Sequence, residues 1–187
     1  MNERRQKLIE AYNSNKIEGV EFLLDNVHDP HNVAAVSRSA DALGVRTIHL
    51  YYTYNECPDM TLKGFKASAS ANRWINYHQV ENLSDFITQK KNQNYKIYGA
   101  AKQEGAKDAS SLDFPKKCLI MMGSEQYGLS PELRQITDEF VFIPMVGMVE
   151  SYNISVAASL LMYQIFQQRK AELDFEIIDS LRGERNS

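Results

Sequence analysis

The sequence has few of the features that mark secreted, membrane-spanning or zinc-binding proteins. Its 187 residues include only two cysteines, Cys57 and Cys118, which lie far apart and have no CxxC partner. Neither a disulfide framework nor a cysteine zinc site is therefore expected. No apolar run approaches the roughly 18–20 residues that a membrane span needs, and the charged N-terminal segment MNERRQKLIE lacks the apolar part of a secretory signal. We expect a cytoplasmic protein with two free thiols and no membrane partner.

The common ligand-binding motifs are also missing. The chain has no GxGxxG dinucleotide loop, no GxxxxGK[ST] phosphate loop and no GxSxG nucleophile elbow. His28 and His31 form an H-x-x-H pattern, but no further histidine or cysteine has the spacing of a metal ligand. No metal site is expected, and the two histidines are interpreted as part of a loop around Pro30.

The net charge of −3 at first argues against a nucleic-acid partner. Residues 171–181, however, contribute four acidic groups and no basic one, so the rest of the chain carries +1. Phosphate binding needs basic groups on one face, not a basic protein overall. Two clusters could supply them, and a solvated mixed surface is the competing interpretation of each. The clusters are Arg4, Arg5 and Lys7 at the start, and Lys63, Lys66 and Arg73 in the middle.

Apolar runs of strand length alternate with helical patterns in a chain that is 43% hydrophobic and 24% charged. This alternation predicts a single α/β domain, a parallel sheet flanked by helices on both faces. Strands are expected at 21–24, 47–51, 74–77, 96–100, 118–122 and 139–143, and helices at 31–43, 62–70, 82–92, 130–137 and 153–169. We divide the chain into an N-terminal helical extension (1–18), the core domain (19–170) and a short acidic C-terminal helix or tail (171–187).

Three segments are not explained by folding alone, and the first is residues 25–45. A polar loop leads into a helix that Gly44 ends as a residue after a C-cap should. Asn32 and Arg38 are six residues apart, about 120° around a helix, so they converge only if Asn32 lies in the loop or at the N-cap. A surface pair between Arg38 and Asp41 is the alternative interpretation of the arginine.

The second segment, residues 119–132, contains a buried strand that ends at Gly123. Glu125 follows directly, and open α/β sheets place ligand contacts just beyond the carboxyl ends of their strands. The alternative is a turn carboxylate bonded to nearby backbone amides. Ser130 is predicted to cap a short helix that has Pro131 at its first position.

The third segment, residues 141–155, follows a strand that Pro144 must end. Its next residues, Met145 to Val149, are too apolar for an ordinary solvent loop. Such a loop suits an adenine ring and a methionine chain, or else it packs on another subunit. Asn153 stands at the expected N-cap of the long C-terminal helix.

Together the three segments resemble the signature motifs of the SpoU/TrmH family, the knotted SPOUT-class RNA 2′-O-ribose methyltransferases. The matching patterns are N-x-x-A-x-x-R-S-A-D-A-x-G-V from Asn32, G-S-E-x-x-G-L from Gly123, and I-P-M-x-G-x-x-x-S-x-N-I-S-V-A from Ile143. The resemblance spans about residues 21–169 and is greatest to the branch that methylates a D-loop guanosine of tRNA.

The resemblance implies properties that periodicity alone does not. It implies a deep trefoil knot near the C-terminus, a homodimer with the active site near the subunit interface, and S-adenosyl-L-methionine as cofactor. By position, the cofactor-binding residues would be Ala100, Gly123, Ile143, Met145 and Tyr152. The RNA partner would be tRNA.

The resemblance assigns the catalytic role to Arg38. Because the pKa of arginine lies above about 12, it is an awkward general base. We expect Arg38 to bind the ribose oxygen and adjacent phosphate and to stabilise the developing alkoxide. Asn32 would orient the ribose or Arg38, and the remaining candidates, Glu125, Ser151 and Asn153, would position the loops and the substrate.

The sequence departs from the family pattern in places. Tyr152 stands where leucine is usual, Ala100 replaces a common threonine, and the ends are short, with an acidic C-terminal segment. The RNA target is therefore less constrained than the chemistry. The alternatives are the same reaction on ribosomal RNA or on a tRNA anticodon-loop ribose, and a non-catalytic RNA-binding module.

Overall fold

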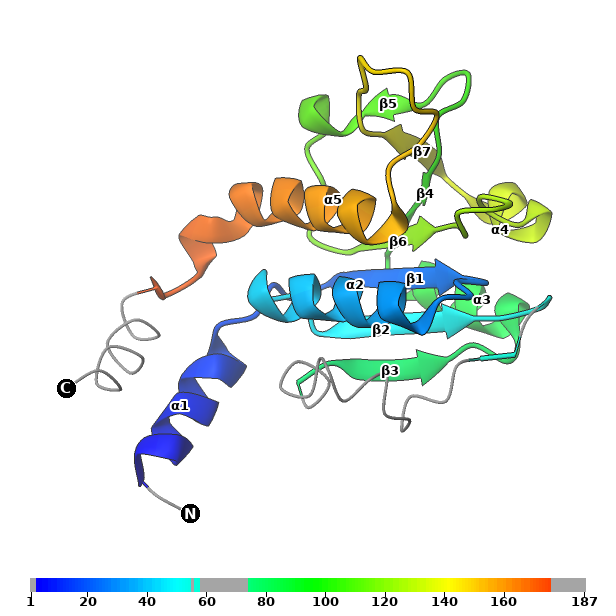
Figure 1. The fold of residues 1–187 in the computed structure, drawn as a ribbon. Coiled ribbons are helices and arrows are strands. Elements are labelled where there is room, and N and C mark those ends of the chain that lie inside the picture. The colour runs from blue at the N-terminus through cyan, green and yellow to red at the C-terminus, as the bar shows by residue number, and fades with distance from the viewer. Residues whose placement is uncertain (1–2, 55, 58–73, 176–187) are drawn as a thin grey trace.

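The computed structural model describes residues 3–54, 56, 57 and 74–175 of the chain, and these form a seven-stranded sheet with helices on both faces (Figure 1). The strand order is β3-β2-β1-β6-β4-β7-β5, and every neighbouring pair is parallel. The prediction of a parallel sheet flanked by helices is confirmed. None of the helices in these residues is long and apolar enough to cross a membrane.

The elements have the following bounds. The strands are β1 (Val20–Asp25), β2 (Thr47–Tyr51), β3 (Asn76–Gln79), β4 (Lys96–Ala100), β5 (Lys107–Asp108), β6 (Cys118–Met122) and β7 (Glu139–Phe142). The helices are α1 (Glu3–Ser14), α2 (Pro30–Ala42), α3 (Leu83–Asn92), α4 (Pro131–Ile136) and α5 (Ile154–Arg169), with 3-10 turns at Ala109–Ser111 and Lys170–Glu172.

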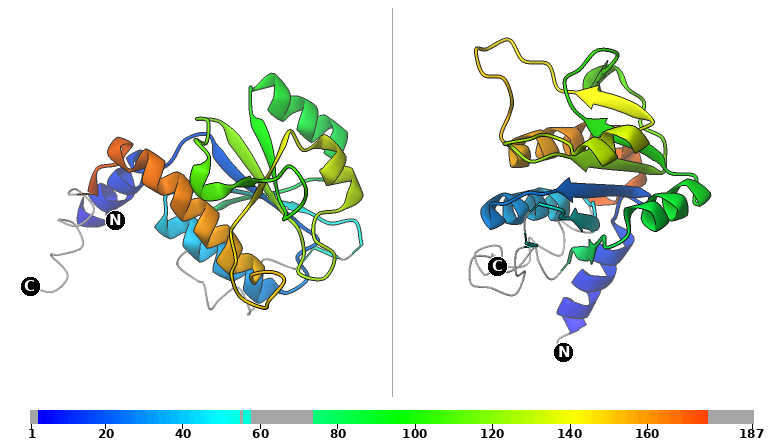
Figure 2. Two further views of the ribbon diagram at one scale, coloured as in Figure 1. Left: turned by 90° about the horizontal axis from the view of Figure 1, so that it is seen from above. Right: turned by 90° about the vertical axis from the view of Figure 1, so that its right-hand side faces the viewer.

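The sheet separates two hydrophobic clusters. Figures 1 and 2 show α2 and α5 side by side on one face, while α3 lies on the other. Successive side chains of a strand point to opposite faces, so in β6 Ile120 joins the cluster under α2 and α5, whereas Leu119 joins the cluster under α3 and α4. Because both of its faces are covered, β6 is apolar throughout, as parallel strands in the middle of a sheet must be.

The differences from the predicted strands lie at or near the edges of the sheet. β3 runs from Asn76 to Gln79 instead of 74–77, and β5, with two polar residues, was not predicted. Both elements lack the apolar run that marks a buried strand. The helix predicted at 62–70, the basic cluster at 63–73 and most of the acidic C-terminal segment lie outside the described residues.

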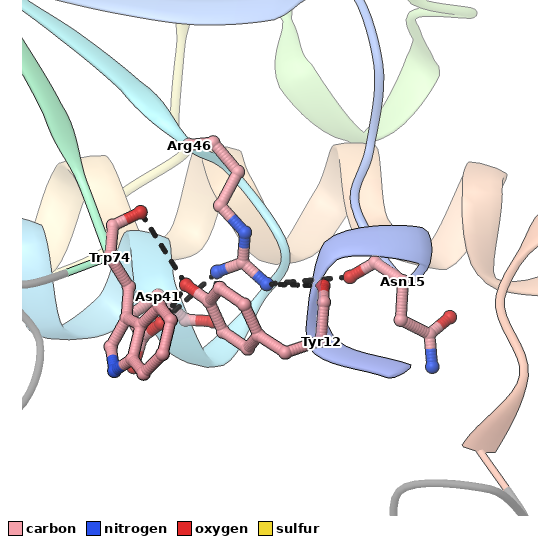
Figure 3. Close-up of polar contacts among 5 residues, drawn as sticks. All are labelled: Tyr12, Asn15, Asp41, Arg46 and Trp74. Atoms are coloured by element: carbon pink, nitrogen blue, oxygen red, sulfur yellow. Dashed lines mark hydrogen bonds and ion pairs between the residues drawn. The ribbon is translucent and has the colours of Figure 1, made fainter. Parts of the chain in front are cut away.

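The N-terminal helix is held to the core domain by Arg46, which directly precedes β2 (Figure 3). Its guanidinium lies 3.5 Å from the centre of the Tyr12 ring and 3.0 Å from a carboxylate oxygen of Asp41. It also donates to the carbonyl oxygens of Tyr12 and Asn15 at the end of α1, where helices leave carbonyls without partners. Tyr12 packs against Trp74 with ring centres 4.6 Å apart.

Candidate active site

A cavity of about 360 Å³ opens where three loops meet at the carboxyl ends of β4, β6 and β7. All five residues predicted to bind the cofactor line it: Ala100, Gly123, Ile143, Met145 and Tyr152. Glu125 and Ser151, two of the predicted catalytic residues, line it as well. Segments far apart in the sequence thus converge on one site, as expected from the position of ligand sites in open parallel sheets.

The turn after β6 is tightly closed and presents Glu125. A Cβ atom on Gly123 would lie only 2.0 Å from the backbone carbon of Gly128, so no side chain fits there. The backbone N–H of Gly128 donates to the carbonyl oxygen of Ser124 at 2.8 Å, and Gly128 has a φ of +66°, which suits glycine. The local sequence therefore fixes the path of this wall of the cavity.

The loop after β7 crosses the cavity and exposes its apolar middle. Val146 and Met148 are fully exposed, at 107% and 100%, so in the single chain nothing covers them. The hydroxyl of Tyr152 donates to the carbonyl oxygen of Pro144 at 3.2 Å and joins the two ends of the loop. The departure from the usual leucine thus gives this position a loop-closing hydrogen bond.

A chain of hydrogen bonds connects the three motifs. The side-chain amide of Asn32 donates to Glu125 at 2.5 Å, and the amide of Asn153 donates to the side-chain oxygen of Asn32 at 3.1 Å. Asn153 also caps α5, because its side-chain oxygen accepts from the backbone N–H of Ser155 at 2.9 Å. The N-cap prediction for Asn153 is confirmed. Glu125 was alternatively interpreted as a turn carboxylate bonded to backbone amides, and it instead accepts a hydrogen bond from the Asn32 side chain.

Asn32 does not lie in the loop or at the N-cap. Asp29 is the N-cap of α2, with its side chain accepting from the N–H of His31, and Pro30 occupies the first turn, so Asn32 is inside the helix. This position agrees with the helix predicted at 31–43, and the condition under which Asn32 and Arg38 would converge is not met. Asn32 still reaches Glu125, because the first turn of α2 faces the turn after β6.

Arg38 points elsewhere. It is exposed, it forms no hydrogen bond or ion pair within the described part of the chain, and it does not line the cavity. The alternative pairing with Asp41 is wrong, because Asp41 binds Arg46 and accepts from the Tyr12 hydroxyl. Arg38 shares the outer surface of α2 with exposed Ala35 and Ala42.

An exposed apolar face lies beside Arg38. The hydroxyl of Ser159 donates to that of Ser39 at 2.7 Å, so α5 lies directly against α2 (Figure 2). α5 turns three large apolar side chains to solvent at i, i+4 and i+7 spacing: Val156, Leu160 and Tyr163. Its opposite face is buried, which gives this helix two apolar sides.

Sequence reasoning missed several residues of the site. Lys102, Arg134 and Glu150 line the cavity and supply its charged groups beside Glu125. Arg134 is held in place by donating to the carbonyl oxygen of Leu129 at 3.1 Å and to the side chain of Gln103 at 2.6 Å. No local pattern marks these residues, because each belongs to an ordinary helix or loop.

Asp25 was also not assigned a role. It ends β1, is fully buried, and accepts from the backbone N–H of Ser130 and the side-chain amide of Asn26, each at 2.7 Å. Burial raises the pKa of Asp25, although these hydrogen bonds oppose the shift. Within the described ranges, no three histidine, cysteine, aspartate or glutamate side chains gather closely enough to hold a metal ion.

The fold and the site define a class of protein: a parallel α/β domain with a cavity of small-ligand size formed by loops at the carboxyl edge of its sheet. Within that class, the chain belongs to the SpoU rRNA Methylase family, whose model matches residues 19–163. The family membership expected from the three motifs is confirmed.

Two characterised relatives and two solved structures are similar to the chain. The tRNA (guanosine(18)-2′-O)-methyltransferase of Escherichia coli K12 is 33% identical over 147 residues, which cover 79% of this chain and 62% of that protein. The chain thus matches less than two thirds of that relative's length. The enzyme of the same name from Thermus thermophilus is 30% identical over 89% of this chain and 84% of its own.

The A. aeolicus TrmH/SpoU tRNA modifying enzyme superposes with a TM-score of 0.78 at 25% identity and covers 96% of this chain and 95% of its own. The SpoU methyltransferase AviRb of Streptomyces viridochromogenes, solved with the cofactor AdoMet, gives 0.72 at 25% identity, with 81% and 58% covered.

Proposed function

We propose that the protein is an S-adenosyl-L-methionine-dependent RNA 2′-O-ribose methyltransferase that modifies a D-loop guanosine of tRNA; its relatives are named as 2′-O-methyltransferases of guanosine 18 in tRNA. The observation that carries the proposal is the convergence of Ala100, Gly123, Ile143, Met145 and Tyr152 on one cavity. Four of these positions were chosen from the family motifs and Ala100 by its matching position, and they lie at the end of β4 or in the loops after β6 and β7.

The cavity fits the cofactor in size and in chemistry. Its volume of about 360 Å³ lies in the range of small-ligand pockets, roughly 300–1,000 Å³. Val141, Ile143, Met145 and Leu161 offer an apolar surface for an adenine ring, while Glu125 and Arg134 offer charged groups for the amino-acid end. Adenosylmethionine supplies a methyl group already activated by its positive sulfur.

The chain's own residues would then align the ribose and help it lose its hydroxyl proton. Asn32, which is held between Asn153 and the cavity-lining Glu125, positions the ribose. Arg38 binds the ribose oxygen and adjacent phosphate and stabilises the developing alkoxide. A phosphate oxygen or a water takes the proton, since the guanidinium stays protonated.

The proposal includes a homodimer, which would bring Arg38 into a shared site. Arg38 stands beside the exposed apolar side chains of α5, and Val146 and Met148 are bare on the neighbouring loop. Large apolar side chains exposed to solvent in this way favour a protein interface. A second copy would cover it and place Arg38 near the cavity of the partner subunit.

The proposal also includes the trefoil knot formed by the C-terminal part of residues 19–170, with residues 1–18 and 171–187 as additions to that domain. We place the protein in the cytoplasm, where both free cysteines would stay reduced. The reaction as proposed needs no metal ion.

The test is incubation with labelled adenosylmethionine and, in parallel, unmodified tRNA or rRNA, followed by nuclease mapping of the label. A methylated D-loop guanosine in tRNA is the expected result. Label in rRNA only would keep the chemistry and overturn the tRNA target. Label in neither RNA would favour the non-catalytic RNA-binding alternative.

A further inference from the structure

A second cavity, of about 580 Å³, adjoins the candidate active site. Ser124, Gly128 and Arg134 line both cavities, so the turn after β6 forms a common wall between them. The remaining lining residues come from the end of β1, the loop after β2 and the start of α4: Asp25, Asn26, Tyr54, Tyr127, Leu129, Ser130 and Pro131. Nothing in the proposed roles of the three motifs uses this space.

Two exposed tyrosines line this second cavity. Tyr54 is 61% exposed and Tyr127 is 66% exposed, the most exposed tyrosines in the described part of the chain. They come from different loops and are brought to one opening beside the predicted methyl-transfer site. Proteins that bind unpaired nucleotides use such aromatic faces to stack the bases.

The polar part of the cavity wall is buried. Asp25 is 0% exposed and Ser130 is 4% exposed. Each Asp25 oxygen accepts one hydrogen bond, from Ser130 N–H or from the Asn26 amide, and a carboxylate has about four acceptor positions. The Asp25 carboxylate thus has more acceptor positions than these two bonds fill.

Ser130 gives the second observation that points to a ligand. Its buried hydroxyl makes no hydrogen bond within the described ranges, and it does not cap α4, although Ser130 is the N-cap residue. The hydroxyl lies near the Asp25 carboxylate and lowers the pKa of that carboxyl, which burial raises. A buried polar group without a partner needs a reason, and a ligand in this cavity would provide one.

We infer that this second cavity receives the base of the nucleotide whose ribose is methylated, and that it is built for guanine. The base would stack on Tyr127 and Tyr54 after leaving the RNA stack. Guanine presents two neighbouring donors, N1–H and its exocyclic amine, which match the acceptors of Asp25 and Ser130. Adenine carries an acceptor at N1 and does not match. This inference rests on the proposed function and adds the base-reading part of the site.

The experiment compares the wild type with the variants Tyr127→Ala, Tyr127→Phe and Ser130→Ala. Gln126→Ala is the matched control, because Gln126 is exposed in the same turn and lines neither cavity. Each is measured for kcat/KM on unmodified tRNA, for adenosylmethionine affinity by calorimetry, and for binding of free GMP and AMP by saturation-transfer NMR. Thermal unfolding checks that every variant is folded.

Tyr127→Ala should lower kcat/KM for RNA by roughly 10- to 100-fold, the range expected for loss of one base–aromatic stack. Tyr127→Phe keeps the ring and should stay close to wild type. Ser130→Ala should lower kcat/KM by roughly 3- to 10-fold through one lost hydrogen bond and reduce the preference for GMP over AMP. Adenosylmethionine affinity should be unchanged in all variants, and Gln126→Ala should resemble wild type.

Unchanged kcat/KM in Tyr127→Ala would overturn the inference, as would equal losses in Tyr127→Phe and Tyr127→Ala. If the wild type methylates no RNA, the proposed function fails. The NMR measurement alone then tests whether the cavity binds guanine. A GMP signal that is lost in Tyr127→Ala and weakened in Ser130→Ala would then support the guanine cavity. A signal that neither substitution changes would overturn it.

Discussion

At the residue scale, two candidate catalytic side chains, Asn32 and Arg38, differ in how firmly the structure holds them. Asn32 is held from both sides by Glu125 and Asn153, whereas Arg38, six residues later, is exposed and unpaired within the described part of the chain. A side chain that must stay in place gains from fixed partners. A cation that meets RNA phosphate must keep its donors free, because a partner carboxylate would compete for them.

Replacing Arg38 with alanine should abolish methyl transfer to RNA and leave adenosylmethionine affinity within a few-fold of wild type. The reason is that Arg38 is proposed to act on the ribose and phosphate and does not line the cofactor cavity. Single-turnover kinetics and calorimetry measure the two quantities separately. An Arg38→Ala enzyme with normal activity would contradict the assignment, while a large loss of cofactor affinity would move Arg38 to the cofactor site.

At the scale of elements, a polar cluster ties β1, β2 and α3 together beneath the sheet. Glu21 on β1 accepts from Tyr95 at 2.8 Å, pairs with His49 on β2 at 2.5 Å and forms an ion pair with Lys90 on α3. Burial would raise the pKa of Glu21, but the hydrogen bonds from His49, Lys90 and Tyr95 lower it to about 2. Ionised Glu21 therefore stabilises the fold above the pKa of an unfolded glutamate, near 4.5.

The resulting pH dependence has a definite direction. As pH falls from about 5 to about 2, the stabilising contribution of Glu21 is lost, because the unfolded carboxyl takes up its proton first. Glu21→Gln should cost about 3 kcal/mol at pH 7, since Lys90 stays buried without its counter-charge, and should flatten this part of the pH profile. Denaturant unfolding between pH 2 and 7 measures both.

The control for this comparison is Glu18→Gln, because Glu18 pairs with Lys16 only at the surface, with 79% of its side chain exposed. Its stability should stay within about 0.5 kcal/mol of wild type. A Glu21→Gln profile parallel to wild type over the whole range would show that the stabilisation comes from other carboxylates.

At the scale of the whole molecule, the outer face of α5 exposes large apolar side chains that a single chain leaves uncovered. Leu160→Arg should convert the proposed dimer to a monomer, because it places a charge at the centre of the exposed side chains between Val156 and Tyr163. The side chain points to solvent in the isolated chain, so helix content should be preserved. Sedimentation and circular dichroism measure these two properties.

The matched control is Thr88→Arg, an exposed position on α3 at the opposite side of the sheet. This variant should sediment as the wild type does. A wild-type protein that sediments as a monomer would remove the dimer from the proposal, and a dimeric Leu160→Arg protein would move the interface to another face.

The sequence predicted what depends on local pattern. The apolar strands β1, β2, β4 and β6 were found within one or two residues of their observed bounds, and Asn153 was recognised as a cap. β5 escaped because Lys107 and Asp108 have no strand pattern. The bond between Asn32 and Glu125 joins residues 93 apart, and no periodicity contains that information.

The site followed the same division. The residues predicted to bind the cofactor all line one cavity, and four of them, Gly123, Ile143, Met145 and Tyr152, lie in two of the sequence motifs. Motif resemblance did not single out Arg134 or Asp25, because they come beside the cavities only when α4 packs against the end of β1. The sequence placed Arg38 on a helix. It could not show that this helix packs against α5, because that contact joins segments far apart in the chain.

The three-loop construction of the cavity also couples folding to metabolism. A ligand that binds only the assembled cavity cross-links segments following β4, β6 and β7, and it stabilises the folded chain by about 2.7 kcal/mol at a concentration one hundred times its Kd. Under the proposed function that ligand is the methyl donor. The amount of folded enzyme would then rise and fall with the cell's supply of activated methyl groups, so that starvation for the donor would deplete the catalyst as well as the reagent.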